Sequence, residues 1–294
     1  MKNEIPHEEK NRVIGGMLYL VSTPIGNLSD LSERAVKVLS EVDFIAAEDT
    51  RNTGKLLSCL GISKQLVSYH EHNKRERGEQ LVQRMLAGES CALISDAGTP
   101  AISDPGEDLV ALCDQYQVPV TAVPGCCAGI TALTLSALPT ARFTFEGFLP
   151  VQKKERRERM AVLVNETRTF ILHEAPHKLR ATLDDLCEAL GADRRISLCR
   201  ELTKKNEEIL RTTLGEAVAL YREKDPRGEY VLVIEGGDGQ AAPSASSEVS
   251  PIELLTYHIE RGLSKKDAIR EVSRTTGLGR NELYDLLLQN EQKT

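Results

Sequence analysis

The sequence has no tryptophan and few aromatic residues of any kind. Its 294 residues include five Phe and seven Tyr. Proteins that bind single strands of nucleic acid through rows of stacked aromatic side chains need more of them, so this class is excluded. Lys and Arg number 37 against 44 Asp and Glu, which gives a net charge of -7. Any RNA or DNA partner must therefore be held by local basic patches rather than by an overall positive field.

Long apolar runs and Cys-x-x-Cys pairs are also missing. No run approaches the roughly 18 apolar residues of a membrane span, so no membrane partner is expected. Residues 1–12 are polar and lack the apolar segment of a secretion signal. Most of the seven cysteines lie in apolar runs, where a reduced thiol behaves as a small hydrophobic group. These features predict a soluble protein of the cytoplasm.

Strand and helix patterns alternate from residue 17 onward, which is typical of βαβ units and a largely parallel sheet. The expected strands of the first series are 17–22, 43–47, 65–69, 91–95 and 118–123. A second series starts near residue 143, and its expected strands are 168–172, 194–200, 207–213 and 230–235. At about 150 residues per domain, the length also favours two folding units. We predict an α/β protein with two α/β domains, 16–145 and 146–236, behind a flexible tail of residues 1–15.

The C-terminal part has a different composition. A stretch rich in Gly, Ala, Ser and Pro, which we assign as a linker over 237–251, has the character of a flexible tether. Beyond it, residues 252–294 carry three helical patterns, 252–260, 265–275 and 281–289. Gly262 and Gly277 would end the first two helices, and Ser264 with Asp267 forms a capping box for the second. A small all-helical domain is expected here.

Three loops at the expected strand ends are rich in glycine and proline. They are 23–27 (TPIGN), 96–106 (DAGTPAISDPG) and 124–129 (PGCCAG). Glycine lets the backbone approach a ligand and proline fixes a loop, and ligands of parallel α/β sheets bind beyond the carboxyl ends of strands. One such loop alone could be an ordinary tight turn, but three on one sheet predict a binding site. Since no phosphate-binding glycine motif is present, we expect a nucleoside-like ligand without a polyphosphate.

Two histidine-containing strings are candidates for a metal or substrate site. His173-Glu174-Ala175-Pro176-His177 matches the H-E-x-x-H pattern of zinc proteases, which requires one continuous helix. Pro176 lies inside the string and the preceding residues have a strand pattern, so we expect a strand end followed by a helix that starts at Pro176, and no metal. His70 and His72 flank Glu71 near another strand end. A solvated loop is the favoured interpretation, with a substrate contact as the alternative.

Two basic clusters lie on expected helices. Residues 151–160 hold five basic and two acidic side chains, and residues 261–280 hold six and two. Each cluster suits a polyanion such as RNA, although a solvated helix face explains either one equally well. The predicted RNA contacts are Lys153, Lys154, Arg156, Arg157, Lys265, Lys266, Arg270, Arg274 and Arg280.

Six segments in chain order carry a family resemblance: LYLVSTPIGN, AAEDTR, SDAGTPAISDPG, VPG, FEGFLP and RELTK. Together they resemble the ribosomal small-subunit methyltransferase I family, the 16S rRNA cytidine 2′-O-methyltransferases of the tetrapyrrole methylase superfamily. The similarity runs from about Met17 to Gly236, and the tethered helical unit fits the extra C-terminal domain of that family. The resemblance implies S-adenosylmethionine in a cleft between the two α/β domains, a homodimer, and 16S rRNA of the small ribosomal subunit as partner.

The resemblance also assigns cofactor contacts. Gly98-Thr99-Pro100 is similar to the family's G-D-P turn with Thr99 in place of Asp, and 124–128 is similar to a P-G-x-S-A loop with Cys127 in place of Ser. At Glu174 the superfamily often has an apolar residue, and a carboxylate there would favour the sulfonium cation of the cofactor. The implied cofactor contacts are Pro24, Gly26, Asp96, Gly98, Thr99, Pro100, Ile102, Pro124, Gly125, Cys127, Ala128 and Glu174.

Methyl transfer from sulfur needs neither a covalent nucleophile nor a metal. The enzyme must align the ribose 2′-oxygen and help its proton to leave. Candidate catalytic residues are Glu48, Asp49, Arg51, Glu201 and Lys204, each of which could equally form a structural ion pair. Two rival functions remain: a methylase of the same fold acting on a small molecule such as a tetrapyrrole, and a non-catalytic RNA-binding assembly factor. The basic tail disfavours the first, and binding of S-adenosylmethionine would exclude the second.

Overall fold

A computed structural model describes residues 12–237, 250–260, 263–276 and 278–291. The chain divides into two compact units, and the boundary between them follows Gly236. Most of the predicted tail and linker lies outside the described residues, as do Gly262 and Gly277 at the expected helix ends. Among the residues that are described, no helix combines the length and the apolar character needed to cross a bilayer.

The first part of the larger unit is built on a parallel sheet. Its elements are β1 (Leu18–Val21), η2 (Leu28–Asp30), α1 (Glu33–Glu41), β2 (Phe44–Ala47), α2 (Thr50–Cys59), β3 (Gln65–Ser68), α3 (Lys74–Leu86), β4 (Cys91–Ile94), α4 (Gly106–Gln115) and β5 (Val120–Val123). The strands lie in the order β3-β2-β4-β1-β5, and every pairing between them is parallel. The expected largely parallel sheet is confirmed.

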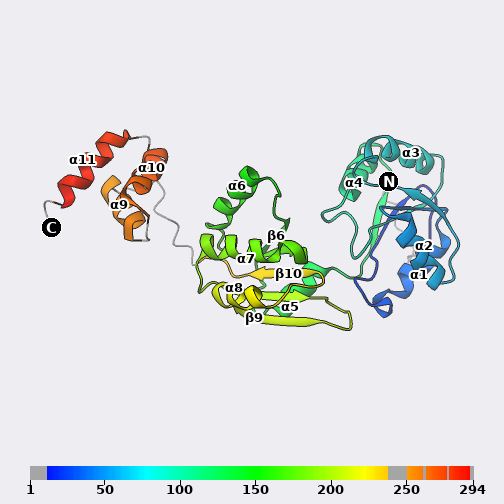
Figure 1. The fold of residues 1–294 in the computed structure, drawn as a ribbon. Helices are drawn as coiled ribbons and strands as arrows, with labels where there is room; N and C mark the ends of the chain where they lie inside the picture. The colour runs from blue at the N-terminus through cyan, green and yellow to red at the C-terminus, as the bar shows by residue number, and fades with distance from the viewer. Residues whose placement is uncertain (1–11, 238–249, 261–262, 277, 292–294) are drawn as a thin grey trace. The chain divides into compact units, whose positions relative to one another are not determined.

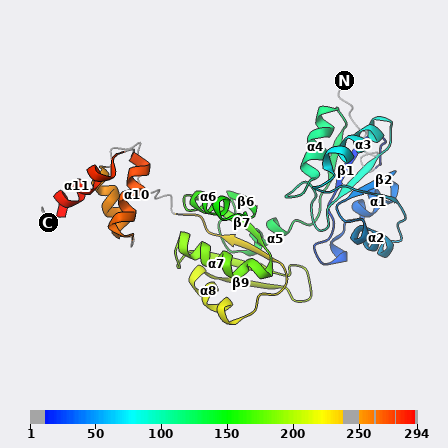
Figure 2. The same cartoon turned by 45° about the horizontal axis from the view of Figure 1, so that its top comes forward.

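Helices cover both faces of this sheet (Figure 1). Because strand side chains alternate between faces, Leu18 packs against the α3 and α4 side while Tyr19 packs against the α1 and α2 side. Helices α3 and α4 lie side by side (Figure 2). All four residues of β2 are buried, as expected for an interior strand of a parallel sheet that helices cover on both faces.

The second sheet is mixed. Its elements are β6 (Phe143–Phe148), α6 (Lys153–Leu163), β7 (Thr169–Glu174), α7 (Pro176–Leu190), β8 (Arg195–Arg200), β9 (Glu208–Thr213), α8 (Leu214–Glu223) and β10 (Tyr230–Ile234). The strand order is β6-β7-β10-β8-β9, with a parallel β6–β7 pair and antiparallel pairs elsewhere. Helices α6, α7 and α8 cover one face of it. The second α/β part is therefore confirmed, and four of its five strands form antiparallel ladders.

Helix α5 (Ala128–Leu135) joins the two sheets. It follows β5 of the first sheet, yet Ala132 and Leu133 pack against Ile171 and Val233 of the second. Gly129 permits this packing, because a Cβ there would lie 3.3 Å from the Phe145 ring. The second sheet is thus covered by helices on both faces. Its hydrophobic core begins before residue 145, where the sequence predicted the boundary between the two domains.

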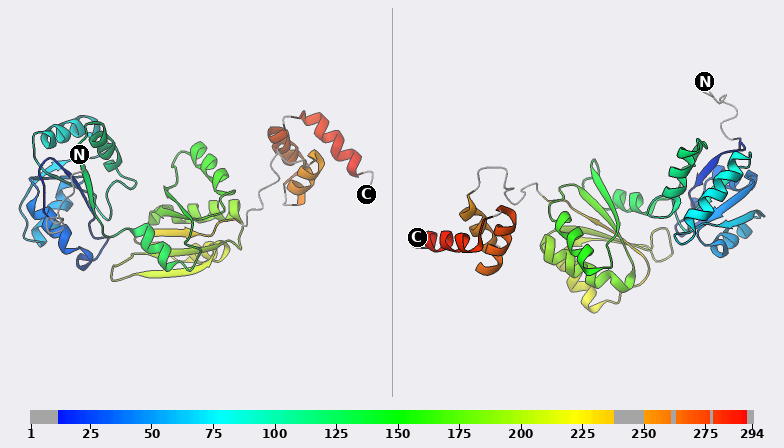
Figure 3. Two further views of the ribbon diagram at one scale, coloured as in Figure 1. Left: turned by 180° about the vertical axis from the view of Figure 1, so that it is seen from behind. Right: turned by 90° about the horizontal axis from the view of Figure 1, so that it is seen from above.

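The smaller unit is a three-helix bundle of α9 (Pro251–Glu260), α10 (Lys265–Thr276) and α11 (Arg280–Glu291) (Figure 3). Its core includes Leu255, Val272 and Leu283. The Ser264 hydroxyl accepts a bond from the Asp267 N–H at 3.2 Å and donates to the Asp267 carboxylate at 2.7 Å, so the expected cap of α10 is present. The all-helical C-terminal unit is confirmed.

Candidate functional site

The three glycine- and proline-rich loops meet at the carboxyl edge of the first sheet. Thr23 and Gly98 exchange backbone hydrogen bonds of 2.9 and 3.1 Å, which ties the first loop to the second. The Thr99 hydroxyl lies 3.0 Å from the Ser22 hydroxyl and donates to the Cys126 carbonyl at 2.9 Å, which ties in the third. The bonds that join the three loops thus form between neutral groups.

Glycine is required where these loops touch. Gly98 has a φ of +84°, and a Cβ there would lie 3.3 Å from the Ile25 side chain. A Cβ at Gly125 would come within 2.7 Å of Ser22. Side chains at these positions would push the loops apart.

The longest loop, 96–106, is held from within. The Asp104 carboxylate accepts bonds from the Ala101 and Gly106 N–H groups at 2.9 and 2.7 Å. Burial raises the pKa of Asp104, and the two backbone bonds only partly oppose this. Ala101 and Ser103 adopt positive φ, which the Asp104 bonds help to maintain. Ile102, a predicted cofactor contact, is an exposed side chain on this loop.

A cavity of about 460 Å³ lies where these loops face the second sheet. Its walls are Ile25, Ala97, Ala128, Phe148, His173, Glu174, Ala175, Pro176, His177, Cys199, Glu201, Leu202, Lys204, Glu229, Tyr230 and Val231. Four of the predicted site residues are among them: Ala128, Glu174, Glu201 and Lys204. The predicted loop residues Pro24, Gly26, Asp96, Gly98 and Cys127 are the chain neighbours of the wall residues Ile25, Ala97 and Ala128. The other predicted loop residues are not part of the wall: Thr99, Pro100, Ile102, Pro124 and Gly125.

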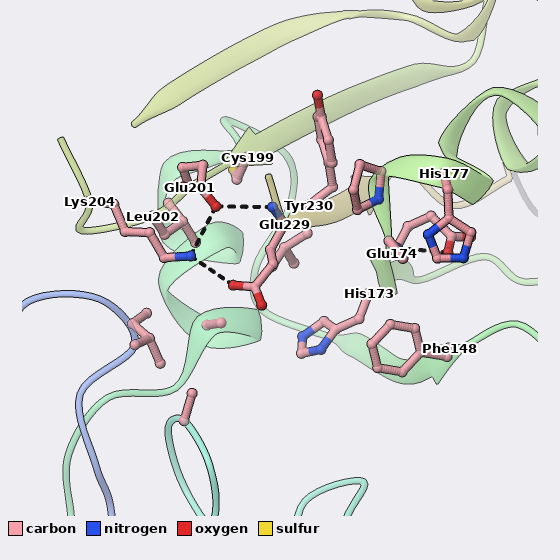
Figure 4. Close-up of a pocket in the computed structure, with 16 residues that line it drawn as sticks. Phe148, His173, Glu174, His177, Cys199, Glu201, Leu202, Lys204, Glu229 and Tyr230 are labelled. Atoms are coloured by element: carbon pink, nitrogen blue, oxygen red, sulfur yellow. Dashed lines mark hydrogen bonds and ion pairs between the residues drawn. The ribbon is translucent and has the colours of Figure 1, made fainter. Parts of the chain in front are cut away.

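Lys204 links two carboxylates in this cavity (Figure 4). Its ammonium lies 2.9 Å from Glu201 and 2.9 Å from Glu229, and the Glu229 N–H donates to Glu201 at 3.0 Å. The Lys204 bond lowers the pKa of Glu201. Burial opposes the charge on Lys204, but the bonds to Glu229 and Glu201 outweigh it and raise the pKa of the ammonium. Gly26 lies against this lysine, since a Cβ there would collide with the Lys204 stem.

His173 supplies an unsatisfied polar atom to the cavity. Its ring stands edge-on to Phe145, with centroids 5.3 Å apart, and to Phe148, with centroids 5.6 Å apart. Figure 4 shows the Phe148 ring beside it. Within the part of the chain that the structure describes, its buried Nε2 has no hydrogen-bond partner. Burial lowers the pKa of His173 against a smaller opposing effect of Glu229, so the ring is neutral at pH 7.

The H-E-x-x-H string is broken as expected. Strand β7 ends at Glu174 and helix α7 starts at Pro176, so the two histidines do not share a helix face. The Glu174 carboxylate accepts bonds from the Thr182 hydroxyl and, at 2.9 Å, from the Ala175 N–H. Each of its oxygens thus accepts one bond, one from the residue that precedes α7 and one from a threonine within the helix. The described ranges contain no group of three or more His, Cys, Asp or Glu side chains arranged to hold a metal ion.

The remaining catalytic candidates form a separate group after β2, outside the cavity wall. Asp49 caps α2 by accepting from the Arg51 N–H at 2.8 Å, and the Arg51 guanidinium holds the pKa of this carboxyl at about 2. The Asp49 N–H donates to Asp96 at 3.2 Å. The pKa of Glu48 is raised, first by partial burial of its carboxyl and then by the charges of Asp96 and Asp104.

The basic residues of α6 divide into two groups. Arg156 bonds to Asp185 at 2.6 Å and to Thr182 at 2.9 Å, and only 18% of its side chain is exposed, so it fastens α6 to α7. Lys154 lies 4.0 Å from Glu158. Lys153 and Arg157 are exposed and have no ion-pair partner among the described residues.

On the C-terminal unit, part of the basic charge is paired locally. Arg270 lies 3.1 Å from Asp267, and Arg274 lies 2.7 Å from Glu271, each within one turn of α10. Lys265, Lys266 and Arg280 are exposed. The cationic surface of this unit is thus smaller than the sequence count suggests.

Sequence reasoning did not identify several wall residues, namely Phe148, His173, Leu202, Glu229 and Tyr230. Glu229 lies just before β10 rather than after a strand. It reaches the site because β10 runs antiparallel to β8, so that the start of one strand lies beside the end of the other. Only the strand order could have revealed this.

Residues 17–218 match the tetrapyrrole (corrin/porphyrin) methylases, and residues 251–291 match the RsmI C-terminal HTH domain. A ribosomal RNA small subunit methyltransferase I from Synechocystis sp. is 48% identical over 94% of this chain and 99% of its own length. One from Halalkalibacterium halodurans is 46% identical over 93% and 95%. Uroporphyrin-III C-methyltransferase from Thermus thermophilus, solved in complex with S-adenosyl homocysteine, shares the fold with a TM-score of 0.53 at 18% identity, covering 74% of this chain and 97% of that one.

Proposed function

This chain belongs to the ribosomal RNA small subunit methyltransferase I family, within the tetrapyrrole methylases, and we propose that it methylates the 2′-hydroxyl of a cytidine ribose in 16S rRNA. It is an S-adenosylmethionine-dependent methyltransferase that acts on RNA. The cavity is the observation that supports methylation of the ribose. On one side of it lie the loops joined by neutral bonds, and on the other lies Lys204 with Glu201 and Glu229. The proposed acceptor is the small ribosomal subunit in the cytoplasm, and the proposed active form is a homodimer.

The residues of the cavity fit S-adenosylmethionine. Ile25, Ala128 and Leu202 offer the apolar surface that a nucleoside base requires. The unpartnered Nε2 of His173 offers a hydrogen bond to a polar atom of the ligand. Glu201 and Glu229 exceed Lys204 by one negative charge, which favours a cationic ligand. When bound, the cofactor supplies a methyl group already activated by its positively charged sulfur.

The chain's own residues then orient the acceptor. Because the bonds to Lys204 lower the pKa of Glu201, this carboxylate stays charged and we assign it, with Lys204, to positioning the ribose. Glu48, whose pKa is raised, lies in the separate group after β2, so it can accept the ribose proton only from an acceptor that extends beyond the cavity wall. Asp49 and Arg51 hold the turn that carries Glu48. Transfer requires the 2′-oxygen to lie in line with the methyl group, which is a task of alignment rather than of covalent catalysis.

The basic side chains serve RNA docking in this proposal. Lys153, Lys154 and Arg157 on α6 are exposed, as are Lys266 and Arg280 on the C-terminal unit. Contacts of this kind bind phosphate without reading sequence. A chain ending at Gly239 is therefore expected to keep its affinity for S-adenosylmethionine and to bind small subunits less tightly, with a flatter dependence on salt. Equal affinities and equal salt slopes for the two chains, measured by titration at several salt concentrations, would limit the C-terminal unit to a structural role.

The test of function is methyl transfer from labelled S-adenosylmethionine. The acceptors are small subunits that lack the modification, compared with naked 16S rRNA and with a tetrapyrrole. We expect label in RNA, recovered as 2′-O-methylcytidine after digestion to nucleosides. Label on another nucleoside or on the base would overturn the proposed acceptor, and label on the tetrapyrrole would favour the small-molecule methylase. Failure to bind the cofactor would leave only a non-catalytic assembly factor.

A further inference from the structure

A second cavity, of about 350 Å³, is lined by Arg200, Lys224, Asp225, Arg227 and Tyr230. None of these residues belongs to the basic clusters that the sequence singled out. Tyr230 also lines the larger cavity, so the two share a wall. We propose that this second cavity binds a backbone phosphate of the substrate RNA next to the methylated ribose. The inference rests on the proposed function, because it requires an RNA acceptor.

The charge of the second cavity favours an anion. Glu208 accepts from Arg200 at 3.0 Å and from Lys224 at 3.0 Å, and Asp225 pairs with Arg180 at 2.7 Å. These ion pairs fix three cationic side chains in place: Arg200 and Lys224 in the cavity wall, and Arg180 beside it. Together with Arg227, the group has four cations against two carboxylates, so positive charge remains for a ligand. Arginine is suited to phosphate because its planar guanidinium can donate two parallel bonds.

Arg227 is the group that remains available. Its side chain is exposed, and no ion-pair or hydrogen-bond partner of its guanidinium occurs among the described residues. Its backbone, in contrast, is fixed, because the Arg227 N–H donates to the Tyr230 hydroxyl at 3.3 Å. The next residue, Gly228, has a φ of +77° and packs so tightly on Glu201 that a Cβ would collide with it. The loop thus presents a free guanidinium from an ordered backbone.

The same loop reaches the larger cavity. Two residues beyond Arg227, Glu229 pairs with Lys204 at 2.9 Å. A separation of two residues spans at most about 7 Å of chain. Stacked nucleotides rise about 3.4 Å each along a strand. The backbones of Arg227 and Glu229 are therefore close enough for a phosphate at Arg227 to belong to a nucleotide near the one whose ribose lies beside Lys204.

The test uses the full chain with two substitutions, Arg227→Ala and Arg227→Glu. Titration against unmodified small subunits should show a three- to tenfold weaker affinity for Arg227→Ala and a larger loss for Arg227→Glu. Losing one phosphate contact should also flatten the slope of log K against log salt by about 0.7 to 0.9. Arg227→Lys keeps the charge and should recover part of the affinity. The matched control is Arg222→Ala, an exposed arginine on α8 that lines neither cavity and should behave as wild type.

Equilibrium binding of S-adenosylmethionine separates the outcomes. Unchanged cofactor affinity in the Arg227 variants, together with weaker subunit binding, supports the phosphate site. Wild-type subunit affinity and salt slope in Arg227→Glu would overturn it. A matching loss of cofactor affinity would also overturn it, since the second cavity would then hold part of the cofactor. If the wild-type chain transfers no methyl group to RNA, the proposed function itself fails, which is a different result from failure of the Arg227 variants alone.

Discussion

The loops at the edge of the first sheet and those at the edge of the second are held by different forces. Between the first set, neutral bonds dominate, such as the Thr23–Gly98 backbone pair and the Thr99 bond to Cys126. Between the second set, ion pairs dominate, such as Lys204 with Glu201 and Glu229. Neutral hydrogen bonds between packed loops depend little on salt, whereas half-exposed ion pairs are screened by it. The loops at the first edge therefore keep their arrangement as salt changes, whereas the ion pairs at the second edge weaken as salt rises.

The strongest test of the neutral edge is Gly98→Val. A branched side chain at a φ of +84° is strained, and its Cβ would press on Ile25 and on the Cys126 carbonyl. Because this would separate the loops, we expect affinity for S-adenosylmethionine to fall at least about a hundredfold, equivalent to about 2.7 kcal/mol. Calorimetric titration measures the loss.

Gly61→Val is the matched control for backbone strain. Gly61 has a φ of +69° in the turn before β3, and a Cβ there would have nothing within 4 Å. We expect it to lower the melting temperature and to leave cofactor affinity unchanged. If Gly98→Val binds S-adenosylmethionine as tightly as wild type, or if both variants lose the same affinity, then the close contact at Gly98 does not shape the binding site.

At the charged edge, Lys204→Ala should change turnover more than cofactor affinity. It leaves Glu201 and Glu229 without the cation between them, and repulsion should then displace the loop that positions the ribose. We expect methyl transfer to fall about tenfold, or about 1.4 kcal/mol in the barrier. Lys205→Ala is the control, since this neighbouring lysine is exposed and absent from the cavity wall. Single-turnover assays at saturating cofactor measure the rate of methyl transfer. A normal rate under these conditions would mean that the loss is confined to cofactor binding, which contradicts the prediction.

A smaller effect is expected from Thr99→Val, which keeps the shape of the side chain and removes its hydroxyl. The Cys126 carbonyl and the Ser22 hydroxyl would each lose a partner. The free energy of unfolding should drop by about 1 kcal/mol. Thr134→Val, at an exposed position whose hydroxyl bonds only within α5, should cost less. Chemical denaturation of both variants gives the comparison, and equal costs would mean that the Thr99 bonds do not hold the loops.

The smallest effect concerns pH. Burial lowers the pKa of His173 in the folded chain, so the unfolded chain binds the proton first as pH falls. The neutral His173 ring contributes fully to the free energy of unfolding above the ordinary histidine pKa of about 6.5. This contribution is lost as pH falls from there through the lower pKa that His173 has in the folded chain. His173→Phe lacks this proton, so its stability relative to wild type should rise between pH 7.5 and 5.5. Chemical denaturation of both proteins across this pH range measures the trend, and a constant difference in the free energy of unfolding would contradict it.

Much of the fold and part of the site follow from local sequence rules. The carboxyl ends of parallel strands must share one edge, so the sequence alone is enough to place three separated loops together. Pro176 likewise fixes the break in the H-E-x-x-H string, because proline is favoured in the first turn of a helix and disfavoured in its interior.

Other features depend on contacts between distant residues. Helix α5 has apolar side chains on most of its faces, so no amphipathic pattern indicates which sheet it covers. In the sequence Arg156 is one cation in a basic run, and its bonds to Asp185 and Thr182, residues distant in sequence, show that it faces α7. The Lys204–Glu201 pair is visible as neighbours in sequence, but Glu229 joins them through the strand order of a mixed sheet.

Helix α5 also determines where this chain can be cut. A fragment that starts at residue 128 carries the helix that covers Ile171, Val231 and Val233. One that starts at residue 146 leaves this apolar face bare and also loses the first half of β6, so it should aggregate. For split-protein reassembly, the natural seam is therefore the short loop between β5 and α5, where cutting the chain leaves each hydrophobic core with its own fragment.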